Sequence, residues 1–116
     1  MSAAAERMLQ VFLVEDHGVV RHGLRHLLEH QPGMAVCGEA ATVAEAESTV
    51  AEPDVVLVDL VLPDGKGHEV VAKVVARWPE AAVLVLTMVD NPSEVRLCLE
   101  AGAAGYLLKE SAAADV

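Results

Sequence analysis

Five short apolar runs alternate along the chain with segments whose apolar residues recur at helical spacing, and this alternation constrains the fold more than any other feature. In the first helical segment, Val20, Leu24, Leu27 and Leu28 would share one face of a helix. The apolar runs lie at residues 10–15, 34–40, 54–59, 81–87 and 103–109. Strands that alternate with helices are typical of a parallel sheet with helices on both faces. We therefore expect one α/β domain, for which 116 residues are sufficient.

Signals at the ends of the helical segments support the same architecture. Thr42 followed by Glu45 is a capping-box pattern, which predicts a helix over residues 42–52. Pro92 stands where the first residue of a helix is expected, because its fixed backbone angle suits that position. Residues 111–116 have the pattern of a fifth helix that is cut short.

The charge of the chain excludes several classes of partner. The formal net charge is −10, and no cluster of Lys or Arg is present, so we expect no direct binding of nucleic acid or of an anionic membrane surface. No apolar run is long enough to span a bilayer, and residues 1–8 lack the apolar core of a signal peptide. We interpret residues 1–8 as an N-terminal lead, residues 9–116 as the domain, and the location as cytoplasmic.

Five polar residues stand at the ends of the predicted strands. Glu15 and Asp16 follow the first apolar run, Asp59 ends the third, Thr87 ends the fourth and Lys109 ends the fifth. In a parallel sheet these ends lie at one edge, where open α/β folds bind their ligands. We therefore expect three carboxylates, a hydroxyl and an ammonium group to converge.

Three converging carboxylates require a compensating positive charge. Two carboxylates about 4 Å apart repel by about 4 kcal/mol at an effective dielectric constant near 20. Lys109 offsets only part of this repulsion, whereas a divalent cation would offset more. Because the candidate ligands Glu15, Asp16 and Asp59 offer only oxygen atoms, they favour Mg²⁺, with Mn²⁺ possible, over zinc.

Four motifs in the sequence resemble the receiver domain of two-component response regulators, over essentially the whole chain. They are "LVEDH", "LVDLVLPDGKGHEV" around Asp59, "LVLT" ending at Thr87 and "AGAAGYLLK" ending at Lys109. The wording of "EDHGVVRHGL", "DLVLPDGKG" and "GYLLK" is most similar to the NarL/LuxR-type subfamily. The resemblance implies a flavodoxin-like (βα)5 fold, a three-layer sandwich with parallel strand order 2-1-3-4-5, whose last helix is truncated in this chain.

The resemblance also implies a metal-dependent phosphorylation site. Asp59 matches the phosphoacceptor, and Asp16 matches the residue that binds Mg²⁺ directly. Glu15 matches an acidic partner that acts mainly through water, and the main-chain carbonyl of Val61 would complete the ligand set. The phosphoryl donor would be a phosphohistidine on a sensor histidine kinase.

Four further residues are expected to act after phosphorylation or to modify it. By the same resemblance, Lys109 would bind the phosphoryl group, Thr87 would be the switch hydroxyl and Tyr106 the switch aromatic. Met88 occupies a position where the family usually has a smaller residue, so we expect it to restrict access to Asp59. Phosphorylation would then control an output. A homodimer that forms on phosphorylation is a further expectation.

Members of this subfamily usually carry a C-terminal helix-turn-helix domain, which binds DNA and which this chain does not contain. We therefore expect control of transcription through that missing domain, and no turnover enzyme beyond the domain's own phosphorylation and dephosphorylation. Two alternatives remain open. A metal-dependent phosphohydrolase would need a second acid two residues after Asp59, where Val61 stands. The other alternative is a receiver-shaped interaction module that no longer accepts phosphate. Met88 is the reason for retaining it, because this residue is expected to restrict access to Asp59.

Overall fold

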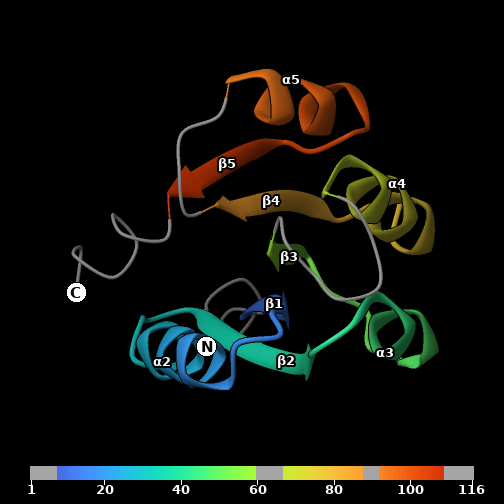
Figure 1. The fold of residues 1–116 in the computed structure, drawn as a ribbon. Helices are drawn as coiled ribbons and strands as arrows, with labels where there is room; N and C mark the ends of the chain where they lie inside the picture. The colour runs from blue at the N-terminus through green and yellow to red at the C-terminus, as the bar shows by residue number, and fades with distance from the viewer. Residues whose placement is uncertain (1–7, 60–66, 88–91, 109–116) are drawn as a thin grey trace.

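The computed structural model describes residues 8–59, 67–87 and 92–108, and it contains a five-stranded parallel sheet in the order β2-β1-β3-β4-β5 (Figure 1). This order confirms the prediction. The strands are β1 (Leu9–Val14), β2 (Met34–Ala40), β3 (Val55–Asp59), β4 (Ala82–Thr87) and β5 (Gly105–Leu108). The helices are α2 (Gly18–Glu29), α3 (Val43–Ser48), α4 (Gly67–Arg77) and α5 (Pro92–Glu100). Within the described residues, no helix is both long enough and apolar enough to cross a membrane.

The two faces of the sheet are covered by different helices, which confirms the three-layer arrangement. Successive residues of a strand point to opposite faces. Leu13 and Leu57 therefore belong to a cluster that packs against Leu24 and Leu28 of α2. Phe12, Val14, Val56 and Val58 belong to a second cluster, which also contains buried residues of α3, α4 and α5. Figure 1 shows α2 on one side of the sheet and α3 and α4 on the other.

Phe12 and Trp78 form the aromatic centre of the larger cluster, and their ring centroids are 5.0 Å apart. Gly38 makes room for Phe12 on the neighbouring strand, because a Cβ atom at Gly38 would lie 2.6 Å from Cε2 of Phe12. The register between β1 and β2 shifts at this point, where Phe12 pairs with Gly38. The indole Nε1 of Trp78 donates a hydrogen bond of 2.9 Å to the carbonyl oxygen of Ala51.

Helix α3 is shorter than predicted. The sequence predicts a helix over residues 42–52, but α3 ends at Ser48 and Thr49 is already extended, with φ −77° and ψ 154°. Two hydrogen bonds from α4 and its C-terminal neighbour hold the following segment: Nη2 of Arg77 donates to the carbonyl of Thr49, and Trp78 donates to the carbonyl of Ala51. Tertiary contacts thus override the helical pattern.

Both helix starts predicted from the sequence are confirmed. The hydroxyl of Thr42 accepts a hydrogen bond of 3.1 Å from the backbone N–H of Glu45, as an N-cap does. The carboxylate of Glu45 reaches back to the N–H of Ala41, at 2.6 Å. Pro92 is the first residue of α5. The fifth helix expected over 111–116 lies outside the described residues.

Candidate functional site

The pairing of the strands brings the acidic residues together at the carboxyl edge of the sheet. Val14 of β1 pairs with Val58 of β3, so the residues that follow them, Glu15 and Asp59, leave the two strands side by side. The strand order changes direction at β1: β2 lies on one side of β1, and β3, β4 and β5 follow on the other side. This is the switch point where open α/β sheets bind their ligands.

Three carboxylates converge at this edge, as the sequence predicts. The side chains of Glu15 and Asp59 are almost completely buried, with exposed fractions of 0% and 2%, whereas that of Asp16 is 31% exposed. One ligand atom from each of Glu15, Asp16, His17 and Asp59 can be chosen so that all four lie within 4.8 Å of one another. The four residues therefore form a compact acidic cluster in which Asp16 and His17 are exposed to solvent, and we call these four residues the acidic pocket.

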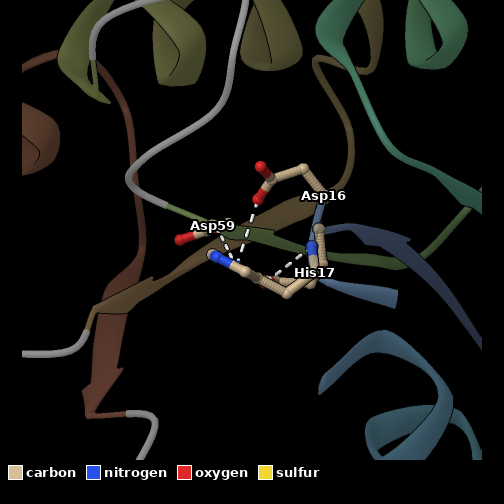
Figure 2. A group of neighbouring side chains, drawn as sticks. Asp16, His17 and Asp59 are labelled. Carbon is tan, nitrogen blue, oxygen red and sulfur yellow. Dashed lines mark hydrogen bonds and ion pairs between the residues drawn. The ribbon is translucent and has the colours of Figure 1, made fainter. Parts of the chain in front are cut away.

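His17 is a member of the pocket that the sequence reasoning missed. Its Nδ1 lies 2.8 Å from Oε1 of Glu15, 3.2 Å from Oδ1 of Asp16 and 3.7 Å from Oδ2 of Asp59. Figure 2 shows the imidazole ring next to the carboxylates of Asp16 and Asp59. Its position directly after Glu15 and Asp16 in the loop between β1 and α2 is the signal that could have identified it.

Arg21 fixes the loop that carries the pocket, and this residue was also missed. Its Nη1 donates a hydrogen bond of 2.7 Å to the main-chain carbonyl of Glu15, and its Nε contacts Oε1 of Glu39 at 3.1 Å. On the other side, the N–H of Glu15 donates to the carbonyl of Ala40, at 2.9 Å. The backbone of Glu15 is thus tied both to α2 and to β2.

The remaining predicted residues are only partly described. Thr87 is the last residue of β4, and β4 pairs with β3 up to the partners Asp59 and Leu86, so its backbone lies one residue beyond that pair. Tyr106 of β5 pairs with Val85 of β4, and the Tyr106 residue is 40% exposed. Val61, Met88 and Lys109 lie outside the described residues, so their roles stay predictions.

The donor atoms of the pocket suit a divalent cation. Mg²⁺ prefers oxygen ligands in octahedral geometry at about 2.0–2.1 Å, bound through one or two carboxylates and several waters. Glu15, Asp16 and Asp59 provide such oxygens, and the exposed side of Asp16 leaves access for water. A bound cation would also reduce the mutual repulsion of the carboxylates. Glu15, Asp16 and Asp59 therefore fit the group that the sequence predicts.

Comparison with known proteins gives consistent matches to one family. The model of the response regulator receiver domain matches residues 11–116. The transcriptional activator DevR/DosR of Mycobacterium tuberculosis is 44% identical over 105 residues, which are 89% of this chain and 48% of that protein. The transcriptional regulatory protein LiaR of Bacillus subtilis is 39% identical over 94% of this chain and 53% of its own length. The chain thus spans about half the length of these curated relatives.

Solved structures agree with these matches. A LuxR-family response regulator from Aurantimonas superposes with a TM-score of 0.84 at 37% identity, over 93% of this chain and 79% of that one. The receiver domain of the response regulator NarL from Mycobacterium tuberculosis superposes with a TM-score of 0.81 at 33% identity, over 90% and 86%. The fold is therefore shared with these structures.

Proposed function

Since the chain belongs to the response regulator receiver domain family and is of the NarL/LuxR type, we propose that it accepts a phosphoryl group on Asp59 from a phosphohistidine of a sensor histidine kinase. One observation supports this function above the others. Asp59 is a buried carboxylate at the end of a central strand, and it lies beside two further carboxylates at the switch point of the sheet. A buried carboxylate in an acidic surrounding is costly for the fold, which is expected where the charge serves a function.

The reaction is a displacement at phosphorus with Asp59 as nucleophile. A carboxylate oxygen of Asp59 forms the new P–O bond while the bond between phosphorus and the donor imidazole breaks, and the bonding pair stays on that imidazole nitrogen. The product is an acyl phosphate. A divalent cation, held by Asp16, Asp59, the carbonyl of Val61 and, through water, Glu15, would neutralise the charge that the phosphoryl oxygens carry.

The residues of this chain then orient and read the new group. Burial between β1 and β4 fixes the strand that carries Asp59, so that its carboxylate is presented without reorganisation. Lys109 would pair with the phosphoryl oxygens, and Thr87 would donate a hydrogen bond to them. As Thr87 moves inward, Tyr106 would turn from its half-exposed position into the space released, which gives the domain two states.

The output that we propose is control of transcription. The relatives named above are a DNA-binding transcriptional activator and a transcriptional regulatory protein, and this chain covers about half of each. We therefore assign residues 9–116 to the receiver, residues 1–8 to a lead, and DNA binding to a helix-turn-helix segment outside the chain. The remaining expectations are a cytoplasmic location, a homodimer formed on phosphorylation, and no turnover of other substrates.

Incubation with acetyl phosphate and Mg²⁺, followed by intact-mass measurement, tests the proposal. We expect a gain of one phosphoryl group that hydroxylamine removes, since acyl phosphates react with it. Asp59→Asn should abolish the gain. Asp54→Asn is a matched control, because Asp54 precedes β3 at its opposite end and an asparagine there can still accept the hydrogen bond from the N–H of Gln10. No gain at any Mg²⁺ concentration would instead favour an interaction module that does not accept phosphate.

A further inference from the structure

We propose that Arg21 is a positioning residue of the cation site. Its hydrogen bond to the main chain of Glu15 sets the directions in which the carboxylates of Glu15 and Asp16 leave the backbone, and this orientation determines the cation affinity. The inference rests on the divalent cation site of the proposed function. It concerns a side chain of α2 that lies outside the group of carboxylates that would hold the ion.

The peptide group between Glu15 and Asp16 is the part of the loop that Arg21 holds. Nη1 of Arg21 donates a hydrogen bond of 2.7 Å to the carbonyl oxygen of Glu15. Because a peptide group is planar, a fixed carbonyl also fixes the N–H of Asp16 and limits rotation of the backbone on both sides. The N–H of Glu15 donates to the carbonyl of Ala40 at 2.9 Å, so the preceding peptide group is held as well. Both carboxylates therefore leave a backbone whose orientation is set from outside the loop.

Arg21 is itself held in place by Glu39 of β2. Nε of Arg21 lies 3.1 Å from Oε1 of Glu39, and Nη1 of Arg25 lies 2.9 Å from Oε2 of the same carboxylate. A guanidinium group is planar, so hydrogen bonds through both Nε and Nη1 fix its plane relative to β2. Glu39 pairs with Leu13 in the register of β1 and β2. The anchor of Arg21 thus lies on the strand next to the one that leads into the acidic pocket.

The charge of Arg21 and its position predict opposite effects on cation binding. A guanidinium group beside the acidic pocket would repel a cation, so removal of its charge alone should leave the cation affinity unchanged or raise it. Loss of the hydrogen bond to Glu15 should instead lower the affinity. Partners that orient metal ligands through hydrogen bonds change metal affinity by about 10–100-fold when they are replaced. The sign of the change therefore separates the two effects.

Isothermal titration with Mg²⁺ compares the wild type with three variants. We expect Arg21→Met to bind Mg²⁺ about 10-fold more weakly. Arg21→Lys keeps the charge but not the planar fork, so it should still bind at least about threefold more weakly. Arg25→Met is the matched control, because Arg25 lies on the same helix and also contacts Glu39, while its other partner is Glu29. Its charge is partly exposed and screened, so the affinity should not fall by more than about twofold.

Two further measurements distinguish positioning from a role in packing α2 on the sheet. In phosphorylation by acetyl phosphate, Arg21→Met should raise the Mg²⁺ concentration for the half-maximal rate by about 10-fold and change the rate at saturating Mg²⁺ by less than about twofold. Without cation, amide hydrogen exchange reports on the loop itself. The N–H of Glu15 is bonded to Ala40 and that of His17 to Oε1 of Glu15. Both should exchange faster by about threefold or more in Arg21→Met but not in Arg25→Met.

The possible results separate this inference from the proposed function. An unchanged or higher affinity in Arg21→Met, wild-type affinity in Arg21→Lys, or unchanged exchange in the loop overturns the role of Arg21 and leaves the cation site intact. An equal loss of affinity in Arg25→Met also overturns it, because that variant keeps the bond to Glu15. No Mg²⁺ binding by the wild type overturns both proposals. Circular dichroism verifies folding, and if Arg21→Met does not fold, the affinity and the exchange of Arg21→Lys decide.

Discussion

Replacing Asp59 by asparagine should stabilise the fold when no divalent cation is present. The side chain of Asp59 is 2% exposed, and it shares the acidic pocket with Glu15, which is completely buried. Asparagine has nearly the same shape as aspartate and carries no charge. The substitution therefore removes carboxylate repulsion at little cost in packing.

The magnitude follows from the separation of the charges. The ligand atoms of the pocket lie within 4.8 Å of one another, and two unit charges at that distance repel by about 3 kcal/mol at an effective dielectric constant of 20. The neighbouring His17 and other contacts of Asp59 offset part of this energy. We therefore expect Asp59→Asn to raise the free energy of unfolding by about 1–3 kcal/mol, and each kcal/mol raises the melting temperature of a domain of this size by about 4 °C.

Urea denaturation at pH 7 in the presence of a chelator measures this difference directly. Glu47→Gln is the matched control, because Glu47 is exposed on α3 and its neutralisation should leave the midpoint unchanged. Saturating Mg²⁺ should then stabilise the wild type, by about 2.7 kcal/mol at 100 times the dissociation constant, and stabilise Asp59→Asn much less. A variant that is no more stable than the wild type without cation would refute the electrostatic reasoning.

Two further predictions concern the core and the cysteines. Gly38→Ala should destabilise the fold by about 1–3 kcal/mol, because its Cβ would lie 2.6 Å from Phe12. Gly23→Ala in α2 is the control: the space around Gly23 is open, so this variant should be neutral or stabilising by up to about 1 kcal/mol. Thermal unfolding measures both differences. Burial raises the pKa of the Cys98 thiol from 9.0 to about 11, so at pH 8 only about one Cys98 thiol in 1,000 is the reactive thiolate. In the native protein, Cys98 should therefore be alkylated far more slowly than Cys37, which is only partly buried and whose pKa burial raises less. Peptide mass mapping measures both alkylation rates, and equal rates would contradict this prediction. As the pH rises from about 9 to about 11, the unfolded thiol ionises before the folded one, so Cys98 should lower the free energy of unfolding across that window, and Cys98→Ala should reduce this slope.

The acidic part of the pocket was predictable because it depends on the register of the sheet. Glu15, Asp16 and Asp59 each stand at the end of an apolar run, and parallel strands bring such ends to one edge whatever the loops do. The same logic predicted the strand order only with the help of the family resemblance, since an alternating pattern alone does not order the strands. The pattern of apolar runs in the sequence therefore predicts those residues of the site that stand at the ends of strands.

The residues that were missed belong to the loop and the helix that follow β1. The orientation of His17 depends on a turn between Val14 and Gly18, and a short turn has no periodicity to extrapolate. Arg21 lies in a helix, but its contacts to Glu15 and Glu39 require the distance between α2 and β2, which is a tertiary quantity. The same limitation explains the overestimated α3, because Arg77 and Trp78 donate hydrogen bonds to the carbonyls of Thr49 and Ala51 and so hold the segment after Ser48 in a non-helical course.

The stability and the function of the pocket are opposed in this fold. Without a cation, the burial of Glu15 and Asp59 costs free energy, and the paired strands β1 and β3 supply the packing that tolerates it. The repulsion is relieved when a cation binds, so the destabilisation of the empty pocket becomes part of the free energy of cation binding. A substitution such as Asp59→Asn that makes the cation-free domain more stable must therefore weaken cation binding. The fold thus retains an unfavourable cluster of charges because cation binding is strengthened by the same interactions that destabilise the cation-free state.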